Sequence, residues 1–150
     1  MGSVLVIGGG AAGLAAAIAA AECGDTVTVA EKMDRVGKKI LATGNGRCNL
    51  MNTGAPRYPG NAAFAADVLS RCGAEAQKAF WEHLGLRLRQ EEAGRVYPVS
   101  SQASSVLDAL RLQLTALHVR VVTGVSITAL NRENDGWTAL SADGQRFRAS

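Results

Sequence analysis

The apolar positions at the start of the chain predict a strand, a helix and a second strand. Residues 4–7 are apolar and mostly β-branched, which is typical of a buried parallel strand, and glycines follow at once. Residues 11–23 are rich in alanine, the strongest helix former, and Gly24 is suited to end that helix. Residues 26–30 read as a second strand. The pattern therefore predicts a βαβ unit, the building block of a parallel sheet.

The middle of the chain predicts two helices and a ribbon. Asn61 is expected to cap a helix that runs to about residue 72, where a glycine follows. A second helix is expected over 74–84, and another glycine stops it. Apolar and basic residues alternate over 86–89, and together with residues 95–98 they predict a short two-stranded ribbon.

The last third predicts one amphipathic helix followed by strands. Either Ser100 or Ser101 is expected to cap the helix, because apolar residues then recur three and four positions apart. A strand over 119–122 follows. Further short strands are expected over 125–130, 137–140 and 145–148. The turns Asp135-Gly136 and Asp143-Gly144 are expected to join them. These last strands predict an antiparallel meander.

The composition is that of one globular domain with little charge bias. Hydrophobic residues make up 47% of the 150 residues, and 16 basic residues against 13 acidic ones give a net charge of +3. So small an excess, with few aromatic side chains, argues against nucleic-acid binding. The apolar run over 4–21 approaches the length of a membrane span, but glycines interrupt it, and no secretory-type basic region or cleavage site appears. We expect a cytoplasmic protein that binds no membrane.

The cysteines and large aromatic residues offer few catalytic candidates. Cys23, Cys48 and Cys72 are odd in number and lack C-x-x-C or metal-ligand spacing, which indicates reduced thiols and no metal site. Cys48 is expected to be a small packed side chain, with a redox-active thiol as the alternative. Tyr97 and Trp81 are expected to pack in the core, with contact to a bound cofactor as the alternative for Tyr97.

Residues 8–13 and Glu31 complete the fingerprint of a dinucleotide-binding site. Gly8 suits the tight turn after the first strand, Gly10 lets the backbone approach a pyrophosphate, and Gly13 lets the helix pack closely on the sheet. The start of the helix directs unpaired N–H groups at the phosphates. Glu31 lies eighteen residues after Gly13, at the end of the second strand, where its carboxylate can accept hydrogen bonds from ribose hydroxyls.

A second glycine-rich segment favours FAD over NAD as the cofactor. It lies within residues 32–49, which lack periodicity over most of their length and predict a long ordered loop. An NAD domain needs only the first turn and the acidic residue, whereas here glycines permit further backbone approach and basic side chains can offset phosphate charge. The residues expected to bind the cofactor are Gly8, Gly10, Ala11, Ala12, Gly13, Glu31, Lys32, Gly37, Lys38, Lys39, Thr43, Gly44, Asn45, Gly46, Arg47, Cys48, Asn49 and Val125.

Several segments resemble those of a known family. They are Val-Ile-Gly-Gly-Gly-Ala-Ala-Gly-Leu at 6–14, Glu-Lys at 31–32, the basic 37–39 with Thr-Gly-Asn-Gly-Arg-Cys-Asn at 43–49, and Gly-Arg-Val-Tyr-Pro-Val-Ser at 94–100. On these the chain resembles, over essentially its whole length, the predicted flavoprotein family of NAD(P)/FAD-dependent oxidoreductases, with its aminoacetone-oxidase-like and bile-acid-reductase-like members. The resemblance implies an α/β, Rossmann-type FAD-binding domain of the glutathione-reductase type with a parallel sheet and an antiparallel β-meander. It also implies flavin-mediated hydride transfer, with NAD(P)H as a candidate electron donor.

The resemblance further implies that residues 1–150 are the N-terminal portion of an FAD/NAD(P)-binding domain. A further parallel strand, a C-terminal flavin segment and other domains of the family are absent after Ser150, so we expect an exposed sheet edge and self-association through it. The sequence assigns no substrate and no catalytic acid or base. Two alternatives stay open: an NAD-binding dehydrogenase module, and a non-catalytic Rossmann remnant that serves as a scaffold.

Overall fold

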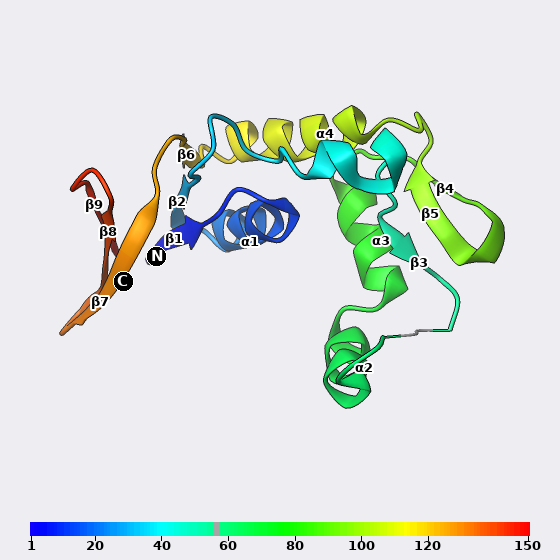
Figure 1. Ribbon diagram of the computed structural model, residues 1–150, viewed down its shortest axis with the longest axis horizontal. Helices are drawn as coiled ribbons and strands as arrows, with labels where there is room; N and C mark the ends of the chain where they lie inside the picture. The colour runs from blue at the N-terminus through cyan, green and yellow to red at the C-terminus, as the bar shows by residue number, and fades with distance from the viewer. Residues whose placement is uncertain (56–57) are drawn as a thin grey trace. The chain divides into compact units, whose positions relative to one another are not determined.

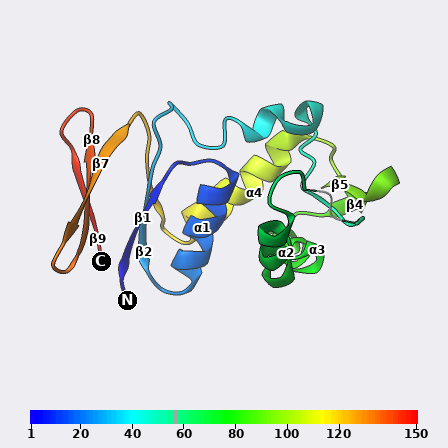
Figure 2. The ribbon, with the colours of Figure 1, turned by 60° about the horizontal axis from the view of Figure 1, so that its bottom comes forward.

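Two compact units make up the chain in the computed structural model, which describes residues 1–55 and 58–150. The first unit contains Met1–Lys39 and Leu110–Ser150, and the second contains Ile40–Ala109. Figures 1 and 2 show the elements of each unit from two directions. Among the described residues, no helix is long and apolar enough to cross a membrane.

The first unit is built on a parallel sheet in the order β1-β2-β6. Its strands are β1 (Ser3–Ile7), β2 (Thr26–Ala30) and β6 (Arg120–Val122), as the apolar pattern predicted to within a residue. β1 and β2 pair in register from Ser3 opposite Thr26 to Ile7 opposite Ala30. Because parallel strands end at the same edge of a sheet, this register places the glycine turn after Ile7 next to the residues after Ala30.

Helix α1 (Ala11–Glu22) joins β1 to β2 and lies along them (Figure 2). Its buried face consists of Leu14, Ala17 and Ile18, each with no exposed surface. Small alanine side chains let the helix lie close to the sheet. Gly24 has φ of +90° directly after the helix, which a side chain would disfavour, so the predicted glycine stop is confirmed.

An antiparallel meander completes the first unit beside β1 (Figure 1). It has the order β7 (Ile127–Glu133), β8 (Gly136–Ser141) and β9 (Arg146–Ala149). Ala139 and Phe147 of the meander pack with Ala30 and Val125 in a buried cluster. The first strand was predicted two residues too early, because the N–H of Val125 bonds to the carbonyl of Glu31 and so belongs to the parallel sheet's edge. The α/β fold with a parallel sheet and an antiparallel meander is confirmed.

The second unit contains the two helices and the ribbon. Asn61 caps α2 (Ala62–Arg71) by accepting a hydrogen bond of 2.9 Å from the N–H of Phe64, as predicted. Helix α3 (Ala74–His83) follows directly. The ribbon has three strands, in the order β3-β5-β4, and not two as predicted. Its strands are β3 (Met51–Asn52), β4 (Leu88–Gln90) and β5 (Arg95–Pro98), and the short helix η2 (Glu92–Gly94) links the last two. β3 is too short to show an alternating pattern.

Three other expectations need correction. The loop predicted over 32–49 contains the kinked 3₁₀ helix η1 (Ile40–Gly46). Helix α4 (Ala103–Ala116), within which the boundary between the units falls, begins after both predicted caps: the Oγ of Ser100 accepts from the N–H of Gln102, and Ser101 has φ of +55°. Trp81 is only half-buried, and its ring meets that of Phe80 edge-on at 5.1 Å. The two rings of α3 pack against each other, so Trp81 gains an aromatic contact without being fully buried.

Candidate functional site

The glycine turn owes its shape to backbone contacts that exclude side chains. Gly8 has φ of +101° and donates its N–H to the carbonyl of Ala30 at 2.8 Å. A Cβ on Gly13 would lie 1.9 Å from the carbonyl oxygen of Gly8, so only glycine lets the helix approach the turn this closely. A Cβ on Gly10, in contrast, would have no heavy atom within 4 Å. Gly10 therefore borders open space, as a backbone that meets a ligand requires.

The N-terminus of α1 opens into the same space. Gly10 is the N-cap, and the first intrahelical bond runs from the N–H of Leu14 to the carbonyl of Gly10 at 2.9 Å. The N–H groups of the first turn have no acceptor within the helix itself, and Ala11 and Ala12 are exposed. Unpaired donors and the positive end of the helix dipole make this end suited to a phosphate group.

Glu31 is buried and already holds the turn in place. One oxygen, Oε2, accepts from the N–H of Gly9 at 2.6 Å, and Oε1 accepts from the N–H of Met33 at 2.8 Å. The sequence predicted a carboxylate aimed at ribose hydroxyls, and it did not foresee this structural role. A carboxylate has about four acceptor positions, so two remain for hydroxyl donors in the cavity that Glu31 lines.

The segment after Glu31 folds back on the glycine turn. Gly37 has φ of +71° and donates its N–H to the carbonyl of Gly9 at 2.7 Å. The buried side chain of Val36 lies against Gly9, where an added Cβ would be 2.5 Å from Val36 Cγ1. Arg111 of α4 donates to the carbonyl of Val36 at 3.3 Å. Sequence reasoning missed Val36 and Arg111, since neither belongs to a motif.

These parts enclose a cavity of about 500 Å³ in the first unit. It is lined by Gly9, Gly10, Glu31, Lys32, Met33, Arg35, Gly37, Lys38 and Lys39. Four of these nine residues are basic and one is acidic, and Lys38 forms an exposed ion pair of 3.5 Å with Asp34. Of the predicted residues, Gly10, Glu31, Lys32, Gly37, Lys38 and Lys39 thus meet at one cavity. Phosphate oxygens find both N–H donors and cations there.

The second predicted segment, which we call loop 43–49, lies in the other unit. Four of its seven residues have left-handed backbone angles: Gly44 (φ +54°), Asn45 (+53°), Gly46 (+79°) and Cys48 (+57°). Asn45 and Asn49 are exposed, whereas Cys48 is buried, as expected for a small packed side chain. Non-glycine residues in this conformation often mark functional loops.

Arg47 of this loop does not present a free charge. Its Nη2 lies 2.5 Å from Glu91 Oε1, and its guanidinium lies over the ring of Tyr97, 4.1 Å from the ring centroid. Tyr97 is buried, as predicted, and supports this stacking. The hypothesis that Arg47 offsets phosphate charge is therefore weakened by a carboxylate that the sequence did not indicate.

Val125 is the remaining predicted cofactor residue. Its N–H bonds to the carbonyl of Glu31 at 2.9 Å, and its side chain packs in the core. This contact places its main chain next to Glu31, and a cofactor contact by Val125 stays a prediction. Among the described residues, no group of three or more His, Cys, Asp and Glu side chains could hold a metal ion.

Comparisons with known proteins show the family to which the chain belongs. The sequence matches the family described as the HI0933-like protein Rossmann domain over residues 2–150. It is 45% identical over 154 residues to the 3-dehydro-bile acid delta(4,6)-reductase of Clostridium scindens, with 99% of this chain and 37% of the relative covered. It is 27% identical over 135 residues to the ribosomal RNA dihydrouridine synthase of Haemophilus influenzae, covering 87% of this chain and 33% of that relative.

A solved structure shows the same fold at low sequence identity. The 3-ketosteroid-delta4-(5alpha)-dehydrogenase of Rhodococcus jostii matches with a TM-score of 0.68 at 17% identity, over 98% of this chain and 43% of that one. These matches show a Rossmann domain of the FAD-binding type that occurs in oxidoreductases. The chain belongs to the HI0933-like Rossmann domain family. It spans 37% and 33% of the lengths of the two curated relatives.

Proposed function

We propose that the cavity at the glycine turn binds the ADP half of FAD, and that the protein reduces a carbon–carbon double bond activated by a carbonyl group. The observation that carries the first part is the meeting of Gly10, the N-terminus of α1 and Glu31 at one basic cavity. The second part rests on the chemistry of the relatives. Each part has its own test.

The geometry fits an adenosine diphosphate group in its size and charge. A cavity of about 500 Å³ lies in the range of small-molecule sites. The pyrophosphate is placed at Gly10 and the first turn of α1, where N–H donors and open space coincide. The ribose is placed at Glu31, whose remaining acceptor positions suit two hydroxyl groups and whose charge disfavours a 2′-phosphate.

The relatives supply the reaction class. One is named as a reductase of a 3-dehydro bile acid and the other as a dihydrouridine synthase. Both names describe the gain of two hydrogen atoms across a ring double bond, in a ring system that also carries a carbonyl group. We propose the same class for this protein: a hydride goes to one carbon and a proton to the other, so the double bond becomes a single bond.

FAD supplies a two-electron carrier that amino-acid side chains lack, and the protein supplies binding and orientation. We propose NAD(P)H as the source of the electrons. The test uses a protein of the relatives' length that contains this domain, with NADPH or NADH and a cyclic enone. Loss of the enone absorbance together with nicotinamide oxidation supports the proposal, whereas nicotinamide oxidation that no enone accelerates would contradict it.

The cofactor assignment is tested on the chain itself. A flavin spectrum that stays with the protein through gel filtration, and a rise in melting temperature with FAD but not with NAD, are the expected results. A larger rise with NAD would favour the dehydrogenase alternative. A colourless chain whose melting temperature responds to neither dinucleotide would favour the scaffold alternative.

The proposal extends to the cellular location of the protein. Cys23, Cys48 and Cys72 are all free thiols in the structure, which agrees with a reducing compartment, and we propose a cytoplasmic location. Fractionation of cells that express the tagged protein tests it. Recovery in a membrane or secreted fraction would contradict the proposal.

Self-association of the 1–150 chain is proposed through the edge of the parallel sheet. β1 is the terminal strand of the order β1-β2-β6, and although β9 of the meander lies beside it, Ile7 at the end of β1 is 48% exposed. Leu130 and Trp137 of the neighbouring meander are about half exposed as well, and with Ile7 they line an apolar cavity of about 230 Å³. Sedimentation is expected to show dimers or larger species that Ile7→Lys reduces. A monomeric wild-type chain would contradict this.

A further inference from the structure

Loop 43–49 has positive φ angles at Gly44, Asn45 and Gly46, which accept them readily, and at Cys48, which does not. The structure around Cys48 must therefore stabilise the loop in this conformation. Within the loop, the carbonyl of Thr43 accepts from the N–H of Cys48 at 3.0 Å, and the carbonyl of Gly44 accepts from the N–H of Arg47 at 3.1 Å. These bonds close a tight turn on itself. They do not fix the turn to the rest of the unit.

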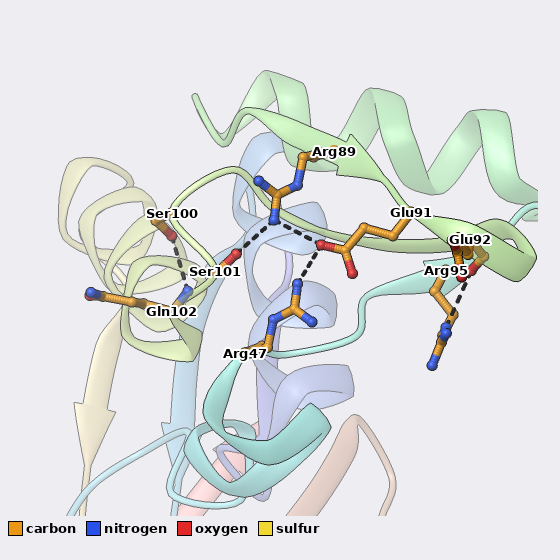
Figure 3. Close-up of polar contacts among 8 residues, drawn as sticks. All are labelled: Arg47, Arg89, Glu91, Glu92, Arg95, Ser100, Ser101 and Gln102. Carbon is orange, nitrogen blue, oxygen red and sulfur yellow. Dashed lines mark hydrogen bonds and ion pairs between the residues drawn. The ribbon is translucent and has the colours of Figure 1, made fainter.

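Two arginines from different segments converge on one carboxylate beside this loop (Figure 3). Arg47 Nη2 lies 2.5 Å and Arg89 Nη2 lies 2.7 Å from Glu91 Oε1. Arg89 Nη2 also donates to the Oγ of Ser101 at 3.0 Å. The carboxylate thus joins loop 43–49 to the β4 side of the ribbon, and the hydrogen bond from Arg47, followed by that from Arg89, lowers the pKa of Glu91.

The register of the ribbon explains why these side chains meet. Arg89 of β4 lies opposite Tyr97 of β5, so the two side chains share one face of the ribbon. Glu91 follows Arg89 by two residues, which is the spacing of one strand face. The guanidinium of Arg47 lies over the ring of Tyr97 on that face. Arg47 thus contacts the ring of the buried Tyr97 and pairs with the carboxylate of Glu91.

We propose that Glu91 is a positioning residue that holds loop 43–49 in its left-handed conformation for contact with the flavin part of FAD. This inference rests on the proposed function, because it takes the predicted cofactor contacts of loop 43–49 as its starting point. It assigns Arg47 a structural partner in place of a phosphate. The side chains of Asn45 and Asn49, which are exposed, then become the groups of the loop available to a ligand.

The arrangement differs from an ordinary surface ion pair. An exposed pair orders two flexible side chains and contributes little. Here the carboxylate is 28% exposed, two guanidinium groups share it, and one of these is stacked on a buried ring. Removing the charge of Glu91 leaves two adjacent cations without their common anion, and their repulsion moves Arg47 away from Tyr97.

The first test measures the order of the loop without any cofactor. Cys48 is buried next to Arg47, whereas Cys23 and Cys72 are exposed, so a thiol reagent should label two cysteines fast and one slowly. In Glu91→Gln we expect Cys48 to be labelled about fivefold faster, with Cys23 and Cys72 unchanged. Peptide mass spectrometry assigns each rate. An unchanged rate at Cys48 would overturn the proposal.

Glu92→Gln is the matched control. Glu92 is the next residue in the chain and carries the same charge, but it meets Arg95 through its main-chain carbonyl, at 3.3 Å from Arg95 Nε. The substitution therefore removes one negative charge from the same ribbon and leaves that contact in place. We expect wild-type labelling at Cys48. Acceleration as large as in Glu91→Gln would show a general charge effect and would overturn the proposal.

The second test separates positioning at the flavin from general damage. FAD and ADP are titrated into wild type, Glu91→Gln and Glu92→Gln. We expect Glu91→Gln to weaken FAD by about fivefold and to leave ADP unchanged, because the glycine turn that takes the ADP half does not depend on Glu91. Equal weakening of both ligands, or no change for FAD, would overturn the positioning role. A wild type that binds neither ligand would refute the proposed function, and the labelling experiment would still decide whether Glu91 orders the loop.

Discussion

The two glycine-rich loops of this chain keep their shapes by different means. In the turn of residues 8–13 the contacts are mainly between backbone groups: Gly13 lies against the Gly8 carbonyl, and Gly37 donates to the carbonyl of Gly9. The carboxylate of Glu31 adds a side-chain contact to the N–H of Gly9. In loop 43–49 side chains do the same work, because Glu91 holds Arg47 on Tyr97. The first loop is therefore sensitive to an added carbon atom at Gly9 or Gly13. The second is sensitive to charge.

The difference also separates what each loop offers a ligand. A turn fixed by its backbone leaves N–H donors and open space at Gly10, which suits a phosphate of any dinucleotide. A loop fixed by an ion pair presents the amide side chains of Asn45 and Asn49, which both donate and accept hydrogen bonds. Such groups can recognise a ring with mixed donors and acceptors. The predictions below test this contrast, from the largest expected effect to the smallest.

The largest effect is expected for Gly13→Ala. The new Cβ would lie 1.9 Å from the Gly8 carbonyl oxygen and 3.3 Å from Val6 Cγ1, which leaves it no room. We expect a loss of about 3 kcal/mol in the free energy of unfolding, at the upper end of overpacking costs. Chemical denaturation measures it. Gly10→Ala is the control, since its Cβ meets open space, and an equal loss in both variants would show that close packing at Gly13 is not the cause.

Glu31→Ala is expected to cost both stability and binding. The buried N–H of Gly9 and the N–H of Met33 lose their acceptor, so we expect about 2 kcal/mol of destabilisation, the scale of a buried unsatisfied donor. ADP affinity should fall as well. Asp34→Ala, at the exposed position next to Met33, is the control. If Glu31→Ala melts like wild type, the carboxylate does not hold the turn.

Gly44→Ala tests whether loop 43–49, like the turn of residues 8–13, is also sensitive to an added carbon atom. Gly44 has φ of +54°, and a Cβ there would lie 2.7 Å from the N–H nitrogen of Asn49. A left-handed angle costs a side chain roughly 1–2 kcal/mol, so we expect a destabilised loop in which Cys48 reacts faster with thiol reagents. The reverse change, Asn45→Gly, should slow that reaction or leave it unchanged. Faster labelling in Asn45→Gly would argue against strain as the controlling factor.

The smallest effect concerns pH. Hydrogen bonds from Arg47 and then from Arg89 lower the pKa of Glu91, so its contribution to stability is present above the ordinary carboxylate pKa and is lost as the pH falls through the lowered value. Below a pH of about 4, the difference in melting temperature between wild type and Glu91→Gln should therefore shrink towards zero. A difference that stays constant from neutral to acidic pH would show that the charge of Glu91 does not matter.

The sequence predicted the first loop well because its constraints are local. A glycine that needs a positive φ, or that touches the backbone of its own motif, leaves a mark at a fixed spacing. Gly8, with its positive φ, and Gly13, which packs against the carbonyl of Gly8, were predicted correctly for this reason. Cofactor contacts by Gly10 and Gly37 stay a prediction. Val36 and Arg111 were missed because an ordinary valine and an ordinary arginine act there through contacts with distant segments.

The second loop was predicted as a motif but not as a structure. Its glycines indicated unusual backbone angles. The partner of Arg47, however, lies 44 residues further along the chain, in the ribbon, and strand β3 of that ribbon has only two residues. Nothing near Arg47 in the sequence indicates Glu91. The pairing of Glu91 with two arginines can be predicted only when the register of β4 and β5 is known. Cofactor contacts by this loop stay a prediction.

The most direct test of the central claim is calorimetric titration of ADP and FAD into wild type, Gly10→Val and Gly2→Val. Gly10 borders open space and Gly2 has only ordinary contacts at 3.5 Å, so both variants should fold. If the pyrophosphate lies at the glycine turn, Gly10→Val loses affinity for both ligands by at least about tenfold, because its side chain fills the space of the phosphates, while Gly2→Val binds like wild type. Equal affinities in all three proteins would contradict the account, because the glycine turn would then not be the phosphate site.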